Sequence, residues 1–320
     1  MNGKWLSSLF FVFVLSFAWT PVWAQNGLVI ITPLGSHDGE FCATDRAMIF
    51  EDPQGLKILY DPGRTVTGGS DARLGDIDVM LLSHVHTDHI GEAAIPAVNA
   101  GTCAAPTLSV DKTPNSNFAE IAAAKGAAVL VGGEMHTFLD AKIDAAAGVN
   151  TNLTQVLRPG GKRTIQGVTF ATVRALHSNG VDSRFLTNPL ADNLTAYVGP
   201  EEGYVIQFSN GLVAYLSGDT GVTSDMETVV REQYGANLAV INIGDIFSTG
   251  PEEAAHAINK LIKPKTVIPS HANEEATVNG VVKAGSKTQR FIDQVKGAKI
   301  FVPLSGVEIR CDGKAKCTQD

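Results

Sequence analysis

The alternation of apolar and polar positions along this chain predicts short strands near its start. Apolar residues dominate three neighbouring segments: Leu28 to Thr32, Ala47 to Glu51 and Leu56 to Tyr60. The last two are separated by Asp52-Pro53-Gln54-Gly55, whose residue types form tight turns, so these segments predict an antiparallel meander. After residue 63, short apolar strands such as Val79 to Ser83 alternate with alanine-rich helical stretches such as Phe118 to Lys125, which is typical of α/β proteins.

The second half of the chain repeats this order of strands followed by helices. Strands are predicted at Val168 to Leu176, Tyr204 to Phe208, Leu212 to Leu216, Leu238 to Ile243 and Thr266 to Ile268. Helices are predicted at Ser224 to Gln233 and Pro251 to Ile262, and Asn210-Gly211 indicates a hairpin turn. Residues 134–163 lack a clear period and are assigned to loops with room for one helix; a helix and two strands are expected to close the chain. The repeated order predicts two sheets stacked face to face, with helices outside.

The first 24 residues have the composition of a secretory signal peptide. Lys4 precedes an apolar run from Trp5 to Trp19, and the small residue Ala24 marks the expected cleavage site. The run is about 15 residues long, short of the roughly 20 that span a bilayer, so we expect no stable membrane anchor; a retained N-terminal anchor is the alternative. Residues 25–320 are then expected to form one exported domain, periplasmic or secreted.

An oxidising compartment would allow the four cysteines to form disulfides. Cys311 and Cys317 are close in sequence, so the preferred pairing joins them and leaves Cys42 to pair with Cys103. Two buried thiols at Cys42 and Cys103 are the alternative. The chain carries a formal charge of -8 and no run of like charges, which argues against a nucleic-acid partner. Nothing in the sequence indicates the oligomeric state.

The most informative motif is Ser83-His84-Val85-His86-Thr87-Asp88-His89, which follows the apolar strand that begins at Val79. In extended backbone His84 and His86 point to the same side, so both can reach one ion. Asp88 and His89 come after a turn and can reach a second ion. Imidazole and carboxylate are usual ligands of zinc, iron and manganese, so the motif predicts a metal site; a chance histidine cluster in a solvated loop is the alternative.

Three further residues follow predicted strand ends and could complete such a site: His177, Asp219 and His271. Taken singly, each has a plain structural interpretation, as a polar loop residue, a turn former and a helix-entry residue respectively. Together with the upstream motif they are better explained as ligands.

With these residues the chain resembles the metallo-β-lactamase superfamily, whose signature is His-x-His-x-Asp-His followed by separate His, Asp and His ligands. The resemblance covers about residues 28–309. It implies an αββα sandwich of two stacked mixed β-sheets flanked by helices, with the site at the edge of the sheets. It also implies the ligand sets: His84, His86 and His177 for one ion, Asp88, His89 and His271 for the other, and Asp219 bridging both.

Within the superfamily, the local sequence motifs of this chain are most similar to those of the branch that contains ascorbate-phosphate lactonase and the N-acylphosphatidylethanolamine phospholipases. The similar stretches are residues 56–62, 215–221, 250–255 and 267–271. The chain departs from the branch at Ile246, where related hydrolases often have histidine. It also departs in residues 185–202, which look inserted, and in the long segment 134–163.

Four other polar residues are candidates for substrate contact or for orienting the ligands: His37, Thr220, Asp245 and Asn273. His37 lies in a glycine-flanked loop, where a solvated histidine is the alternative. His136 and His256 are taken as structural.

The sequence therefore predicts an exported hydrolase with two divalent transition-metal ions, zinc first and manganese or iron as alternatives. Asp88 is the expected catalytic residue, because it would orient the attacking hydroxide as well as bind metal. The expected substrate is a small molecule with an ester or lactone-type bond. A β-lactamase is less favoured because of Asp219. The resemblance implies that dedicated β-lactamases of this fold have Cys or Ser at this position, whereas the general hydrolases have the bridging Asp. A phosphodiesterase is disfavoured by the acidic charge. A periplasmic metal-binding or interaction module is the non-enzymatic alternative.

Overall fold

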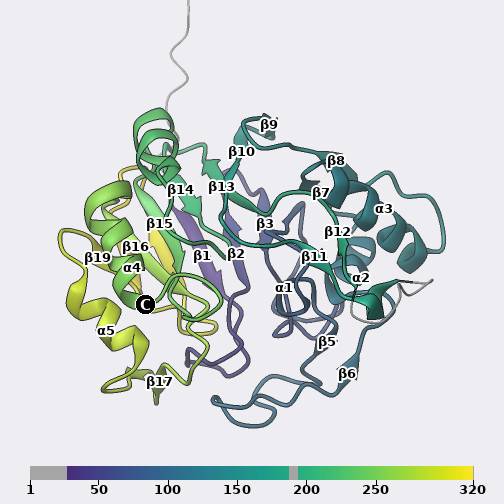
Figure 1. Ribbon diagram of the computed structural model, residues 1–320, viewed down its shortest axis with the longest axis horizontal. Coiled ribbons are helices and arrows are strands. Elements are labelled where there is room, and N and C mark those ends of the chain that lie inside the picture. The colour runs from purple at the N-terminus through teal and green to yellow at the C-terminus, as the bar shows by residue number, and fades with distance from the viewer. Residues whose placement is uncertain (1–26, 187–193, 320) are drawn as a thin grey trace, which may run out of the picture.

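The computed structural model describes residues 27–186 and 194–319, and in it two β-sheets stack face to face between outer layers of helices (Figure 1). This is the αββα sandwich predicted from the sequence, and both sheets are mixed. The predicted signal peptide, residues 1–24, lies outside the described residues.

The first sheet contains eight strands. In spatial order they are β21 (Cys317–Gln319), β20 (Ile309–Cys311), β1 (Val29–Pro33), β2 (Met48–Glu51), β3 (Lys57–Tyr60), β4 (Val79–Leu81), β7 (Ala128–Val131) and β8 (Thr154–Val156). The strands from β3 to β8 are parallel, and the others are antiparallel.

The second sheet contains seven strands. In spatial order they are β19 (Lys299–Ile300), β16 (Thr266–Ser270), β15 (Leu238–Asn242), β14 (Val213–Leu216), β13 (Glu202–Gln207), β10 (Val168–Arg174) and β9 (Lys162–Ile165). The described residues also form three small two-stranded antiparallel sheets: β5 (Ala93–Ala94) with β6 (Val110–Asp111), β11 (Gly180–Val181) with β12 (Ala196–Tyr197), and β17 (Thr277–Val278) with β18 (Val281–Val282).

Helices cover the outer face of each sheet. The first sheet packs against α2 (Asn117–Lys125) and α3 (Gly133–Ala147). The second sheet packs against the π-helical η2 (Met226–Gln233), α4 (Pro251–His256) with its π-helical continuation η3 (Ala257–Ile262), and α5 (Lys287–Gln294). Two single turns, α1 (Thr87–Ile90) and the 3-10 turn η1 (Ser183–Phe185), lie in loops. No helix of the described residues has the length and apolar character to cross a membrane.

The main core lies between the sheets. It includes Phe50 from the first sheet and Phe170 and Tyr204 from the second, all fully buried. Burying a large apolar side chain contributes about 1.5–3 kcal/mol, so this layer is a major source of stability. Strands β4 and β15 are buried along their whole length, because helices cover the face that does not meet the other sheet.

Local signals in the sequence correspond to the observed turns. Asn210-Gly211 forms the hairpin between β13 and β14, with Gly211 in the left-handed region at φ 92°. The turn Asp52–Gly55 joins β2 to β3. The predicted helix at Pro251 begins with that proline.

The segment 134–163 is more ordered than predicted. It contains most of the fifteen-residue helix α3, strand β8 and the start of β9, so its assignment mainly to loops was wrong. The helix starts at Gly133 and buries only Met135, Leu139 and Ile143, a narrow apolar stripe. The two strands are short edge strands with little buried surface, so no apolar run marks them. Three short strands rather than two close the chain after α5.

Candidate metal centre

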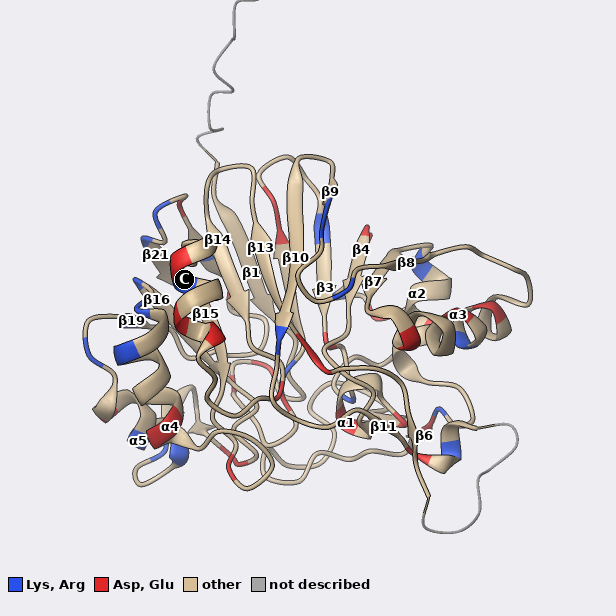
Figure 2. Cartoon of the chain, turned by 45° about the horizontal axis from the view of Figure 1, so that its top comes forward, with Lys and Arg blue, Asp and Glu red and all other residues tan. Residues whose placement is uncertain are grey.

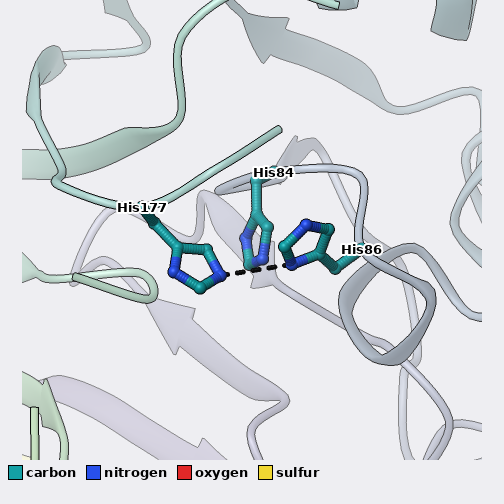
Figure 3. A group of neighbouring side chains, drawn as sticks. All are labelled: His84, His86 and His177. Atoms are coloured by element: carbon teal, nitrogen blue, oxygen red, sulfur yellow. Dashed lines mark hydrogen bonds between the residues drawn. The ribbon is translucent and has the colours of Figure 1, made fainter. Parts of the chain in front are cut away.

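Three histidines meet where strand β4 of the first sheet and strand β10 of the second end. His84 and His86 follow β4, and His177 follows β10 (Figure 3). Their ring centroids are 4.5 to 4.9 Å apart, and Nε2 of His177 lies 3.2 Å from Nδ1 of His86. The potential ligand atoms of these residues, here called the three-histidine cluster, lie within 4.8 Å of one another. The spacing suits one ion.

A second group, here called the carboxylate cluster, lies beside the first and comprises Asp88, His89 and His271. Oδ2 of Asp88 lies 3.2 Å from Nε2 of His271 and 3.7 Å from Nε2 of His89. Asp88 and His89 belong to α1, whereas His271 directly follows β16. His271 has φ 51°, so its left-handed backbone turns the chain sharply after the strand and brings the ring inward.

Asp219 lies between the two clusters. Its Oδ1 is 3.5 Å from Nε2 of His89, and its Oδ2 is 3.3 Å from Nε2 of His271 and 3.9 Å from Nε2 of His177. The preceding residue must be glycine, because a Cβ on Gly218 would lie 2.8 Å from the carbonyl oxygen of Glu202. This close approach fixes the carboxylate between both groups.

Asp61 and Ser83 orient two of these histidines from behind. Ser83 donates its hydroxyl hydrogen to Oδ2 of Asp61 at 2.7 Å, and its oxygen lies 3.0 Å from Nδ1 of His84. His89 donates from Nδ1 to the same Asp61 oxygen at 2.8 Å. Both rings therefore direct Nε2 toward the centre, the arrangement that holds metal-binding histidines. Sequence reasoning did not assign Asp61 a role, although its position directly after β3 was a signal.

The donor atoms fit divalent metal ions. Nε2 of His84, Nε2 of His89 and Oδ1 of Asp219 are buried and have no hydrogen-bond partner. Buried polar atoms without partners are costly, and here three converge from different elements. Imidazole nitrogens and carboxylate oxygens without thiolates are the ligands of zinc, manganese or iron centres. The residues present thus match the predicted cofactor class.

The three-histidine cluster is prepared to bind metal. Burial and neighbouring histidines lower the pKa of His84 well below its usual range. Burial followed by the His177 ring lowers the pKa of His86, and burial lowers that of His177. These rings are therefore neutral at pH 7, and a neutral imidazole is the form that binds metal.

In the carboxylate cluster, neighbouring charged groups together have a larger effect on the pKa values than burial does. Burial opposes ionisation of Asp88, but the Arg46 guanidinium and then His89 hold its pKa well below the usual range. Burial likewise opposes ionisation of Asp219, yet His271 and His89 lower its pKa strongly. Against the effect of burial, the carboxylates of Asp219, Asp88 and Asp61 raise the pKa of His89 to about 10.

An open cavity of about 820 Å³ lies over the two clusters, a size suited to a small molecule. Its wall includes the apolar side chains of Leu194 and Phe247. Two arginines also line it, and each is ion-paired: Arg46 with Asp88, and Arg64 with Glu92. Neither arginine was identified from the sequence, because nothing in their local pattern marks them.

The four weaker candidates lie in different surroundings. Asn273 lines the cavity. Thr220 is buried, and its hydroxyl accepts the Leu176 N–H at 2.9 Å, so it connects the Asp219 loop to the residue before His177. His37 contacts Ser36 and Gly101 and is not part of the cavity wall, and neither is the exposed Asp245. His136 and His256 lie in α3 and α4, outside both clusters.

The sequence pattern of the β-lactamase superfamily domain matches residues 44–271. Two bacterial relatives, each a UPF0173 metal-dependent hydrolase, are 32% identical to this chain. That of Polynucleobacter asymbioticus aligns over 260 residues, 78% of this chain and 77% of the relative. That of Pelotomaculum thermopropionicum aligns over 219 residues, 68% of this chain and 77% of the relative.

Solved structures show the same fold. Igni18, a metallo hydrolase of Ignicoccus hospitalis, superposes with a TM-score of 0.59 at 21% identity, over 89% of this chain and 99% of that one. The metallo-β-lactamase fold protein YhfI of Bacillus subtilis gives 0.55 at 12% identity, over 89% and 99%.

Proposed function

Since this chain belongs to the metallo-β-lactamase superfamily and is a metal-dependent hydrolase of that fold, we propose that it uses two divalent ions to cleave an ester or lactone bond in a small molecule. One observation carries the proposal of two ions: Asp219 has one oxygen toward His89 and the other toward His177 and His271. A single carboxylate that faces both clusters is suited to bridging two ions. Zinc is the first choice of metal, and manganese or iron are the alternatives.

When bound, two such ions supply Lewis acidity and a nucleophilic hydroxide at neutral pH. The protein's own residues do the positioning. Asp61 and Ser83 hold His84 and His89 with Nε2 toward the centre. Asp88, whose side chain is 25% exposed at the cavity, orients the attacking water by accepting a hydrogen bond from it.

The charge of the cavity supports a neutral carbonyl substrate. Both arginines in its wall are paired with carboxylates, so neither offers a free positive charge to a phosphate. Basic and acidic residues are interspersed over the described elements (Figure 2). A polyanion such as a nucleic acid would gain little from this distribution, and the net charge of -8 would repel it.

The test is a substrate panel on one metal-loaded preparation. We would measure kcat/KM for an acyl lactone, a 4-nitrophenyl ester, bis-4-nitrophenyl phosphate and a chromogenic cephalosporin. The lactone and the ester should be hydrolysed faster than the phosphodiester, with the β-lactam slow. A phosphodiester rate tenfold above both, about 1.4 kcal/mol in transition-state stabilisation, would overturn the ranking and favour a phosphodiesterase. Absence of hydrolysis with full metal content would favour a metal-binding module.

Export after cleavage near Ala24 is part of the proposal. It is supported by the pairing of all four cysteines in two disulfides, Cys42–Cys103 and Cys311–Cys317, which confirms the predicted connectivity. Structural disulfides are typical of oxidising compartments. The intact mass of protein from the native cell should correspond to a start near Gln25. A mass that includes the first 24 residues would contradict export.

A further inference from the structure

The side chain of Arg46 lies beside the carboxylate cluster and is almost completely buried, with 4% of its surface exposed. Its Nη1 forms an ion pair with Oδ2 of Asp88. Among the described residues, Asp88 is the only carboxylate that forms an ion pair with Arg46. This oxygen is therefore the ion-pair partner of the guanidinium, and the buried carboxylate of the neighbouring Asp45 also interacts with its charge.

The same Asp88 oxygen faces the other potential ligands of the cluster. Oδ2, not Oδ1, lies 3.2 Å from Nε2 of His271 and 3.7 Å from Nε2 of His89. An ion held by these two histidines would take this oxygen as its third ligand, at about 2.0–2.2 Å for zinc. Arg46 and the ion would thus approach the same atom.

We propose that Arg46 competes with the metal ion of the carboxylate cluster for Asp88. The guanidinium thereby weakens metal binding at the carboxylate cluster, the second position, relative to the three-histidine cluster. This inference rests on the proposed two-ion centre. It makes the occupancy of the second position depend on the supply of metal.

The position of Arg46 is fixed by its surroundings. Its Nε donates to the carbonyl oxygen of Thr44 at 3.3 Å. The neighbouring Asp45 accepts the backbone N–H groups of Ser36 and Cys42 at 2.9 and 2.8 Å, and Cys42 is tied to Cys103 by a disulfide. Because this segment is anchored on both sides, Arg46 stays near Asp88 when an ion arrives. In a buried, low-dielectric site the repulsion between the two cations is poorly screened.

The chain contains a matched control. Arg64 lines the same cavity and is also ion-paired, but its partner is Glu92, with Nε 2.9 Å from Oε2. Its Nη2 donates to the hydroxyl of Thr87 at 3.1 Å, and neither partner belongs to a ligand cluster. Arg64 therefore reports the effect of removing a cavity arginine without freeing a ligand oxygen.

The experiment is a titration of zinc into the metal-depleted protein, followed by calorimetry and by competition with a chromophoric chelator. The wild-type protein should show two binding events whose dissociation constants differ by at least about tenfold. Arg46→Gln should tighten the second event by about tenfold or more and leave the first within about twofold. Arg46→Lys, which keeps the charge, should tighten it less. Arg64→Gln should change neither event.

Two results would overturn the competition: wild-type protein that binds both ions with equal affinity, or Arg46→Gln protein whose second affinity stays within about twofold of wild type. Circular dichroism of the metal-free variants checks their fold. If Arg46→Gln does not fold, the wild-type isotherm and the Arg46→Lys shift decide the question. A wild-type protein that binds no zinc at all would instead refute the metal centre itself, and with it the proposed function.

Discussion

The two halves of the centre differ in how the charges of their own side chains are balanced. The three-histidine cluster consists of neutral rings, and the pKa values of His84, His86 and His177 are all lowered. The carboxylate cluster is already balanced by charge, since Asp88 faces Arg46 and His89 lies among three carboxylates. Two adjacent sites with similar ligands can thus differ in metal affinity. An ion at the first site meets neutral rings, whereas an ion at the second must replace existing charge interactions.

The difference follows from where the surrounding residues originate. Around His86 and His177 the potential ligand atoms mainly meet one another. The fold adds a cation, Arg46, beside Asp88 from the segment before β2, and a carboxylate, Asp61, beside His89 from the end of β3. The identity of the ligands alone therefore does not determine the properties of the two positions. Substitutions at the shared residue and at residues of each half should therefore have different effects.

Asp219→Asn should have the largest effect, since both halves use its carboxylate. Metal content should fall from about two equivalents to less than one, and kcat should fall by about a thousandfold or more. Elemental analysis after dialysis and the ester assay measure the two quantities. Glu227→Gln is the control and should match the wild type in both quantities, because Glu227 lies in η2 and pairs with Arg231, outside both clusters. Full metal and full activity in Asp219→Asn protein would show that the carboxylate does not bridge.

His86→Ala and His271→Ala should separate the halves. Each removes one neutral nitrogen ligand from one cluster only, so each variant should lose about one equivalent of metal and at least about a hundredfold in kcat. Elemental analysis of the two variants in parallel is the measurement. If either substitution empties both positions, the clusters behave as one unit and the comparison between them is wrong.

Asp61→Asn should weaken the carboxylate cluster more than the three-histidine cluster. Asp61 accepts a hydrogen bond directly from His89, whereas it reaches His84 only through Ser83. Loss of such an orienting partner costs about 10–100-fold in metal affinity. Zinc titration should place the larger loss in the second binding event, and Ser83→Ala should have a smaller effect on that event. Equal losses of zinc affinity in both binding events would mean that Asp61 supports both clusters to the same degree.

Glu202→Gln should have the smallest effect and should not distinguish the halves. Burial raises the pKa of Glu202 from 4.5 to about 8, so the folded protein keeps a proton that the unfolded chain releases. This contribution to stability is fully present below about pH 4.5 and is lost as the pH rises through 8. The variant should match the wild type in Tm at low pH and exceed it by a few degrees at pH 9. A change in metal stoichiometry would show instead that Glu202 acts on the centre.

The candidate centre was predictable because each of its residues stands at a recognisable place in the sequence, just after a predicted strand. His84 and His86 stand two residues apart at the end of a buried strand, and His177, Asp219 and His271 each follow a strand end. Strands β10, β14 and β16 point the same way, so their ends meet at one edge of the sheet. The predicted ligands lie together for that reason.

The parts that were missed depend on contacts between distant segments. Arg46 acquires its role only through Asp88, 42 residues away, and its own neighbours give no indication of it. Strands β8 and β9 are held by pairing to β7 and β10, with few buried side chains of their own. Local patterns identify strand ends and motifs, whereas partners supplied by the tertiary fold leave no such pattern.

Strand β1 has neighbours from opposite ends of the sequence. One is β2, which follows shortly after it, and the other is β20, whose Cys311 pairs with Val29 across the sheet and whose hairpin is closed by the disulfide to Cys317. While the protein is being synthesised, β1 therefore presents an open edge until residues 309–311 have left the ribosome, and open edges invite aggregation. Completion of the first sheet thus depends on a pairing between two strands that lie far apart along the chain, β1 and β20.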